Sequence, residues 1–213
     1  MKKLSGIAGT LAIVSIGVLA QEAQRPTYNV GDTWVYERTD KTKNVVEGGR
    51  ENRLTAKSDS EYRYESQNLQ SGIPQSFATN LDGNTTETGG RKWTPSIPNF
   101  QWPLTVGKKW EGKYGGTNQA GSGPYSEERK CEVAAQEPVQ VKAGTFSAFK
   151  IVCTGWYRTP NSSGQVTLNG QTWITYWYAQ DARRSVKIEY RDASQFGPWN
   201  NWADELVSFE LKK

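Results

Sequence analysis

The stretches TWITYWYA (172–179) and RSVKIEY (184–190) place large apolar side chains at every second position. In RSVKIEY, Val186, Ile188 and Tyr190 share one face of an extended chain, with polar residues between them. This pattern predicts a half-buried β-strand. In TWITYWYA aromatic or aliphatic side chains fall on both faces. We therefore predict a central strand that is covered on both sides.

The same period of two recurs along the chain, and no helical period is convincing. AFKIVCTGWY (148–157) alternates in this way, and ELVSFELK (205–212) places Val207, Phe209 and Leu211 on its predicted inner face. Short turn signals separate such runs, among them Asp82-Gly83, Asn169-Gly170 and Gly197-Pro198. Closely spaced strands with tight connections predict an all-β antiparallel meander, which forms a closed or half-open barrel or a β-sandwich.

Residues 66–101, rich in Gln, Asn, Thr, Gly and Pro, are predicted to be the least regular part of a single domain that spans 21–213. We expect one polar hairpin around Asp82-Gly83 and then an extended segment through WTPSIPNFQWPL (93–104). Three prolines exclude a helix or a central strand there: Pro95, Pro98 and Pro103.

A short repeat occurs at VGDTWVYERT (30–39) and VGKKWEGKYGG (106–116). In each copy the glycine permits a turn that other residues avoid, and the tryptophan becomes an inward-facing residue of a new strand. The residues concerned are Gly31 and Trp34 in the first copy and Gly107 and Trp110 in the second. We interpret the repeat as two equivalent strand beginnings, and the alternative is a ligand site.

The N-terminus has the pattern of a secretory signal peptide. Lys2 and Lys3 precede an uncharged stretch, residues 4–19, and small residues lead up to a cleavage site after Ala20. A membrane anchor is the alternative, but about 20 apolar residues are needed to span a bilayer. No Cys follows the stretch, so the lipid attachment of a bacterial lipoprotein is not expected. We predict a signal peptide at 1–20 and a periplasmic or secreted protein of a Gram-negative bacterium, with no transmembrane segment after cleavage.

Export determines how the two cysteines, Cys131 and Cys153, are interpreted. In an oxidising compartment a single pair predicts one disulfide. The residues between them suggest two strands around a turn at 142–145, midway between the cysteines. Directly opposed residues of antiparallel strands lie within disulfide reach. No CxxC spacing supports a redox role.

The charge balance argues against a nucleic-acid partner. The formal net charge of the whole chain is +4, and Lys2 and Lys3 leave with the signal peptide. Phosphate binding needs a clustered basic face, whereas basic residues here occur as pairs such as Arg183-Arg184 and Lys212-Lys213. We interpret these pairs as a solvated turn and a chain terminus.

Three segments resemble a loosely defined family of uncharacterised exported β proteins and lipoproteins of Gram-negative bacteria. The counterparts of its motifs are QWPLTVGKKW (101–110), VQVKAGTFSAFKI (139–151) and WYAQDARRSVKIEY (177–190), and YNVGDTWVYE (28–37) extends the likeness to the N-terminal strand. The resemblance implies the fold and an envelope location, and it brings no catalytic residues. The chain departs from the family at Gln180, where a proline is usual, and in having two cysteines.

The chain contains no histidine. This excludes Ser-His-Asp and Cys-His nucleophile systems and His-ligated metal sites, and no Gly-rich GK[ST] loop supports phosphoryl transfer. Glycoside hydrolysis needs only two carboxylates. The pairs Glu127-Glu128 and Asp204-Glu205 are adjacent, so in a strand they point to opposite faces, and we interpret them as solvated charges. We therefore predict a non-enzymatic protein without a cofactor.

Aromatic residues provide the remaining functional signal, with 9 Trp, 10 Tyr and 6 Phe in the chain. Four tryptophans lie in Pro-, Gly- or Asn-rich stretches predicted as connections: Trp93, Trp102, Trp199 and Trp202. They are candidate ligand-binding residues, either for a lipid or other apolar ligand or, as a stacking platform, for a polysaccharide. The alternative is a purely structural role, in which these tryptophans cover the open ends of the fold. The leading hypothesis is an envelope protein that binds an apolar ligand or helps to assemble or transport an envelope component through a protein partner. Carbohydrate binding is the alternative.

Overall fold

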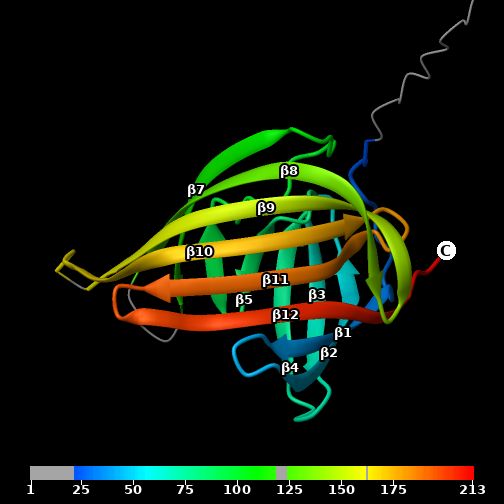
Figure 1. The fold of residues 1–213 in the computed structure, drawn as a ribbon, viewed down its shortest axis with the longest axis horizontal. Coiled ribbons are helices and arrows are strands. Elements are labelled where there is room, and N and C mark those ends of the chain that lie inside the picture. The colour runs from blue at the N-terminus through cyan, green and yellow to red at the C-terminus, as the bar shows by residue number, and fades with distance from the viewer. Residues whose placement is uncertain (1–21, 119–123, 162) are drawn as a thin grey trace, which may run out of the picture.

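The computed structural model describes residues 22–118, 124–161 and 163–213, and these residues form an all-β fold (Figure 1). The strands are Thr33–Asp40 (β1), Val45–Lys57 (β2), Glu61–Asn68 (β3), Pro74–Asn80 (β4), Thr85–Thr88 (β5), Arg91–Thr94 (β6), Lys109–Asn118 (β7), Tyr125–Val141 (β8), Gly144–Pro160 (β9), Val166–Ala179 (β10), Arg184–Ser194 (β11) and Gly197–Glu210 (β12).

Each strand pairs antiparallel with its neighbours in sequence, and β1 also pairs with β12, so the sheet closes into a barrel. The predicted antiparallel meander is confirmed, and the closed barrel is the form it takes. Closure removes the free edges that an open sheet would present to other chains. The predicted signal peptide at 1–20 lies outside the described residues. No helix in the described part of the chain is long and apolar enough to cross a membrane.

The prediction that β10 is covered on both faces is confirmed only for the end of the strand, because Trp173 and Thr175 on the outer face stay partly exposed. Ile174 and Tyr178 point to the interior and are almost fully buried. Trp177 is on the other face, yet it is only 8% exposed. The tip of the β8–β9 hairpin, which includes Val139 and Phe146, belongs to the same buried cluster. Figure 1 shows this hairpin curling over the ends of β10, β11 and β12.

The predicted inner face of ELVSFELK is wrong at its first residue. Val35 of β1 pairs with Ser208 and the next residue, Tyr36, pairs with Leu206, so Val207 is the extra residue of a β-bulge. Leu206 has no exposed surface and takes the core position instead. A bulge shifts the alternation by one residue, and its place depends on the partner strand.

The two copies of the repeat begin β1 and β7, as predicted. Gly31 has φ 94° and Gly107 has φ 89°, a region that residues with a Cβ rarely adopt. Trp34 is fully buried and Trp110 is 9% exposed. Both tryptophans therefore belong to the core of the barrel.

The backbone hydrogen bonds of the two strand beginnings also match. The Gly31 N–H donates to the Leu54 carbonyl at 2.8 Å, and the Gly107 N–H donates to the Val133 carbonyl at 2.8 Å. In each case the acceptor residue returns a hydrogen bond of 2.9 Å to the carbonyl of the residue after the glycine. The repeat thus marks equivalent turns that join each new strand to its neighbour, β2 or β8.

We predict that Gly107→Ala lowers the free energy of unfolding by about 1 kcal/mol, because the methyl group meets open space and only the positive φ opposes it. Gly107→Asn should cost less, since Asn tolerates a positive φ better. Urea unfolding followed by tryptophan fluorescence measures both. If the alanine variant is as stable as the wild type, the positive φ at position 107 imposes no strain on a residue with a Cβ.

The segment 66–101 is more regular than predicted, because it contributes β4, β5 and β6 to the barrel. The expected hairpin around Asp82-Gly83 is present between β4 and β5, with Gly83 at φ 80°. A second hairpin at Gly89-Gly90 joins β5 to β6. The sequence did not predict these strands, because β5 and β6 are only four residues long and their side chains are mostly polar.

Residues 95–104, here called the strap, form neither a helix nor a barrel strand, as the prolines predicted. The Ile97 N–H donates to the Thr85 carbonyl at 2.9 Å, and the indole N–H of Trp110 donates to the Pro98 carbonyl at 2.9 Å. At its end, Leu104 forms an isolated bridge with Ala23. The strap therefore links β5, β7 and the N-terminal segment, close to the point where β6 and β7 pair over only four residues.

The predicted disulfide is confirmed. Cys131 of β8 and Cys153 of β9 are directly opposite each other, with a Cα–Cα distance of 4.1 Å, and their sulfurs are bonded. The turn between the strands lies at Lys142-Ala143. The bridge fastens the longest hairpin of the barrel across its inner face, where both cysteines are buried.

We predict that the double variant Cys131→Ser, Cys153→Ser loses about 3 kcal/mol of unfolding free energy, because the bridge limits the freedom of the unfolded chain. Urea unfolding with and without reductant measures the loss. Reductant should destabilise the wild type by a similar amount and leave the double variant unchanged. A wild type that is insensitive to reductant under unfolding conditions would contradict this prediction.

Candidate functional site

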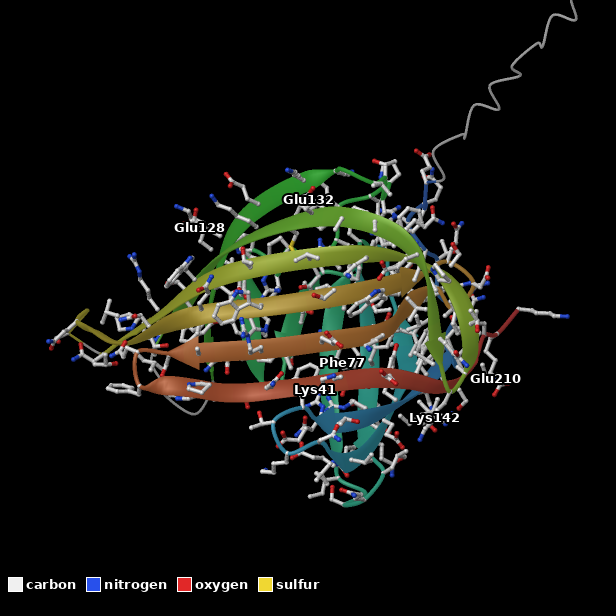
Figure 2. All side chains as sticks on the ribbon, viewed as in Figure 1. Lys41, Phe77, Glu128, Glu132, Lys142 and Glu210 are labelled. Carbon is white, nitrogen blue, oxygen red and sulfur yellow. A yellow bond between two sulfur atoms is a disulfide. The ribbon has the colours of Figure 1, made fainter. Side chains whose placement is uncertain are left out.

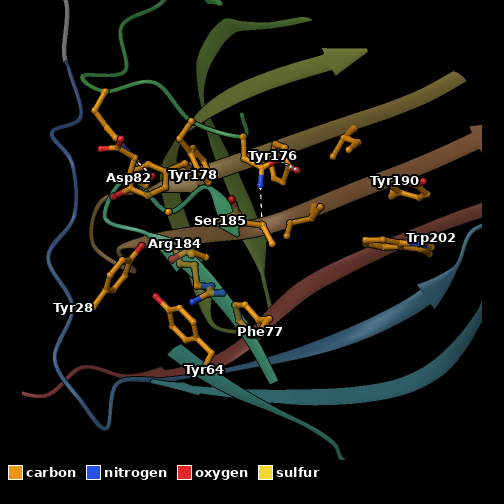
Figure 3. Close-up of a pocket in the computed structure, with 18 residues that line it drawn as sticks. Tyr28, Tyr64, Phe77, Asp82, Tyr176, Tyr178, Arg184, Ser185, Tyr190 and Trp202 are labelled. Atoms are coloured by element: carbon orange, nitrogen blue, oxygen red, sulfur yellow. Dashed lines mark hydrogen bonds between the residues drawn. The ribbon is translucent and has the colours of Figure 1, made fainter. Parts of the chain in front are cut away.

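The barrel interior contains a cavity of about 240 Å³, here called the aromatic cavity (Figure 3). Most of its wall consists of rings and aliphatic side chains from β4, the strap and β10 to β12. They include Phe77, Phe100, Trp102, Ile188, Tyr190 and Trp202. Asp82 is the one carboxylate on this wall, and its side chain is partly exposed and paired with Arg25 at 3.3 Å.

Arg184, the one cationic residue of this wall, is the first residue of β11 and directly follows the turn from β10. The turn is held by three buried aromatic side chains, each donating a hydrogen bond of 2.8 Å to a backbone carbonyl: Trp34 to Ala182, Tyr28 to Arg183 and Tyr36 to Ser185. Arg183 has φ 53°, which reverses the chain there. Three aromatic residues of the core thus fix the backbone on both sides of Arg184.

The Arg184 guanidinium lies among aromatic rings. Its central carbon is 4.8 Å from the ring centroid of Trp34, 4.7 Å from that of Tyr64 and 5.5 Å from that of Phe77. Figure 3 shows the side chain directed toward Tyr64 and Phe77. Burial raises the pKa of Tyr36 and of Tyr64, so both remain neutral phenols at neutral pH. Rings offset part of the cost of burying the cation but supply no negative charge.

The interpretation of Arg183-Arg184 as a solvated turn is therefore wrong for Arg184. Both residues are partly exposed, but the Arg183 guanidinium lies 3.9 Å from Asp32, whereas Arg184 lines the aromatic cavity. A signal for this was present in the sequence. In RSVKIEY (184–190) the side chains at even-numbered positions share one face of the strand. Three of them line the aromatic cavity: Arg184, Ile188 and Tyr190. The pair of basic residues obscured that alternation.

A second hollow of about 380 Å³, here called the arginine hollow, adjoins the aromatic cavity. The two spaces share four wall residues: Phe77, Arg184, Ile188 and Trp202. Arg38 and Arg50 also line the arginine hollow, and Asp204 is its one carboxylate. Arg38 binds Asp204 through two hydrogen bonds of 2.6 Å. Burial and the charge of Arg38 lower the pKa of Arg50, although an arginine remains protonated in proteins.

At another place in the interior, Glu127 and Arg129 form a buried ion pair at 2.8 Å. Glu127 also accepts hydrogen bonds from Thr172 at 3.0 Å and from Tyr125 at 2.6 Å. Burial, followed by the charge of Glu127, raises the pKa of Tyr125. Because all these partners satisfy the carboxylate, the arrangement is that of a structural network.

This network holds the strap in place. Asn99 of the strap accepts hydrogen bonds from Arg129 at 2.8 Å and from Tyr176 at 3.0 Å. The strap is thereby tied to β8 and β10, and its residues Phe100 and Trp102 stack on each other, with ring centroids 5.5 Å apart. The ion pair therefore helps to build the wall of the aromatic cavity without lining it.

The prediction that paired carboxylates point to opposite faces is confirmed, but the inner members are not solvated. Glu127 is 3% exposed, whereas Glu128 projects outward from β8, as Figure 2 shows, and pairs with Lys113 at 3.3 Å. Asp204 is 5% exposed, whereas Glu205 pairs on the outside with a lysine. No cluster of His, Cys, Asp or Glu in the described residues could hold a metal ion.

Two of the four candidate tryptophans meet at the aromatic cavity. Trp102 belongs to the strap and donates its indole N–H to the Asp82 carbonyl at 2.8 Å. Trp202 lies on β12 rather than in a connection, and its ring stacks on Tyr190, with centroids 5.1 Å apart. On the other side the Arg38 guanidinium lies 3.8 Å from the Trp202 ring centroid.

The other two candidates lie elsewhere, and both are on strands rather than in connections. Trp93 of β6 contacts Tyr114 and Tyr125 edge-on, with ring centroids 5.6 Å away in each case. Trp199 of β12 is 55% exposed. The structure therefore places Trp102 and Trp202 at one cavity and separates Trp93 and Trp199 from it.

Comparison with solved structures finds the same architecture in two bacterial proteins. A candidate lipoprotein from Parabacteroides distasonis matches with a TM-score of 0.56 and 15% sequence identity, over 88% of this chain and 99% of its own. A candidate exported protein with a YmcC-like fold from Bacteroides fragilis matches with a TM-score of 0.57 and 13% identity, over 88% and 99%. The chain shares this YmcC-like fold.

At these identities the likeness establishes the fold alone. A weaker match is the hypothetical lipoprotein YmcC of Escherichia coli, with a TM-score of 0.47 and 11% identity over 86% of this chain and 84% of its own. No protein-family model matches the chain, and no curated protein matches it significantly. The expected likeness to exported β proteins and lipoproteins is confirmed at the level of the YmcC-like fold, and the sequence motifs stay a prediction.

We predict that Glu127→Gln and Arg129→Met each cost about 3 to 5 kcal/mol of unfolding free energy, because each leaves a buried partner without its counter-charge. The double variant should cost much less than the sum of the two. Urea unfolding of all four proteins completes this cycle. Glu128→Gln is the matched control on the outer face and should change stability by less than about 1 kcal/mol. A double variant that loses as much unfolding free energy as the two single variants together would contradict the coupling between Glu127 and Arg129.

Proposed function

We propose that this protein is a non-enzymatic, exported component of a bacterial cell envelope that binds an apolar ligand inside its barrel. The observation that carries the proposal is the aromatic cavity, which lies inside the barrel and is walled mainly by rings and aliphatic side chains. Such walls favour apolar ligands, since binding removes apolar surface from water. A role in carrying an envelope component to a protein partner would use the same cavity.

Export is supported by three independent features. The sequence has the pattern of a signal peptide at 1–20. The Cys131–Cys153 bridge is typical of oxidising compartments. The two structures with the same fold are described as an exported protein and as a lipoprotein. A location in the periplasm or outside the cell is therefore part of the proposal.

The absence of catalysis is also a proposal. A glycoside hydrolase needs two carboxylates flanking the scissile bond. The aromatic cavity presents Asp82 alone among its lining residues, and Asp82 pairs with Arg25. The buried Glu127 is satisfied by its own network. These pairings support a binding role over a hydrolytic one.

Native mass spectrometry of the protein, purified after export without detergent, tests the proposal directly. We expect the mass of residues 21–213 less two hydrogens, together with an added mass that dissociates and fragments as a lipid or another apolar molecule. The wild type should also bind the neutral apolar dye N-phenyl-1-naphthylamine. A protein that carries no added mass and does not bind the dye would overturn the proposal.

Two variants separate the apolar cavity from the carbohydrate alternative, which the exposure of Trp199 favours. Trp202→Ala removes part of the cavity wall and should weaken dye binding several-fold, whereas Trp199→Ala should leave it unchanged. Retention on a polysaccharide that is lost in Trp199→Ala, with unchanged dye binding in Trp202→Ala, would favour carbohydrate binding instead. Circular dichroism of both variants controls for folding.

A further inference from the structure

The wall of the arginine hollow carries an excess of positive charge. It contains three guanidinium groups, those of Arg38, Arg50 and Arg184, and one carboxylate. Asp204 is fully engaged by Arg38 through its two hydrogen bonds. None of the ion pairs among the described residues includes Arg50 or Arg184. Arg50 and Arg184 therefore face the same space without an ion-pair partner among the described residues, and the nearby Asp204 is already bound by Arg38.

Such an arrangement is unfavourable in an empty protein. Removing a cation from water costs free energy unless an anion or sufficient hydrogen bonds replace the lost hydration. The rings around Arg184 compensate in part. Arg50 shares the hollow with the like charge of Arg38 and with Asp204, whose opposite charge Arg38 already pairs with. A bound anion would neutralise the charges of both Arg184 and Arg50. A guanidinium group forms strong hydrogen bonds with the oxygens of a carboxylate or a phosphate.

Unpartnered polar atoms in the same walls point to a ligand independently. Asn52 lines the arginine hollow and is 8% exposed, and its side-chain oxygen has no hydrogen-bond partner. Tyr178 lines the aromatic cavity and is 1% exposed, and its hydroxyl also lacks a partner. Buried polar groups are normally hydrogen-bonded. These two remain available to a molecule that occupies the interior.

The two spaces are adjacent and differ in chemistry. Arg184, Phe77 and Ile188 belong to both walls, so they form the boundary between the aromatic cavity and the arginine hollow. On one side of this boundary lie the rings of Phe100 and Trp102, and on the other lie guanidinium and amide groups. A ligand that fits both sides has an apolar part and an anionic part.

We propose that the ligand is a single-chain amphiphile whose anionic head group, a carboxylate or a phosphate monoester, pairs with Arg184 and Arg50. Its apolar chain occupies the aromatic cavity. This inference rests on the proposed function and names the chemical class of the ligand. It assigns Arg184 as the residue that distinguishes an anionic from a neutral amphiphile.

Calorimetric titration of the delipidated protein with ligands of equal chain length tests the inference. The probes are decanoate, decyl phosphate and decanol, with acetate and inorganic phosphate as chain-free anions. We expect the tighter of the two anionic amphiphiles to bind at least about tenfold more tightly than decanol. Whether decanoate or decyl phosphate is the tighter one identifies the head group. The chain-free anions should bind more weakly than either.

Substitutions then assign the effect to the two arginines. Arg184→Met should lower the affinity for the preferred anionic amphiphile about tenfold and leave the affinity for decanol nearly unchanged, because Met preserves an apolar contact with the rings. Arg50→Gln should also lower the affinity for the anionic amphiphile and leave the affinity for decanol nearly unchanged. This variant replaces Arg184→Met in the test if Arg184→Met does not fold. Arg191→Gln is the matched control, since Arg191 stacks outside on Trp173 at 4.1 Å and should bind every probe like the wild type.

The outcomes separate this inference from the proposed function. If decanol binds as tightly as both anionic amphiphiles and neither Arg184→Met nor Arg50→Gln changes the affinities, the inference of an anionic head group is wrong. The proposal of an apolar ligand is then still supported. Inorganic phosphate or acetate binding as tightly as its alkyl counterpart would show a site for a free anion and overturn the amphiphile. No binding of any alkyl probe would overturn both proposals.

Discussion

The pairing of β1 with β12 is the interaction on which the rest of the structure depends. It joins Thr33 to Glu210 and Asp40 to Trp202, residues from opposite ends of the described chain. Beside it, the fully buried carboxylate of Asp32 accepts hydrogen bonds from the backbone N–H groups of Asn29 at 2.9 Å and Lys212 at 2.6 Å. Closing so long a chain costs entropy. In return, β1 and β12 each gain a second neighbour, so that every strand of the barrel has two.

The size of the barrel explains why its interior is not uniform. Eight strands make a barrel just wide enough for side chains to fill, and this barrel has twelve strands within the described residues. The strap fills one part of the wider interior, held through Asn99 by Arg129 and Tyr176. Between the strap, β4 and β10 to β12, large rings approach one another without closing the space, and the aromatic cavity remains.

The interior concentrates polar and charged groups as well as rings. The ion pair of Glu127 and Arg129 and that of Arg38 and Asp204 are both satisfied by protein partners. Arg184 differs, because the aromatic side chains that fix its turn leave its guanidinium among rings. Closure therefore has an electrostatic consequence: a cation that water would surround on an open sheet lies here among rings and beside other guanidinium groups.

The sequence by itself determined the features that depend on near neighbours. Period two located the long C-terminal strands, Gly31 and Gly107 predicted the two strand beginnings, and the spacing of Cys131 and Cys153 about a turn predicted their bridge. Only the tertiary structure decided that the meander closes, where the bulge at Val207 falls, which tryptophans meet, and that Arg184 faces inward. These features depend on contacts between segments distant in the chain, and no local pattern encodes which strand or strap will lie opposite a given side chain.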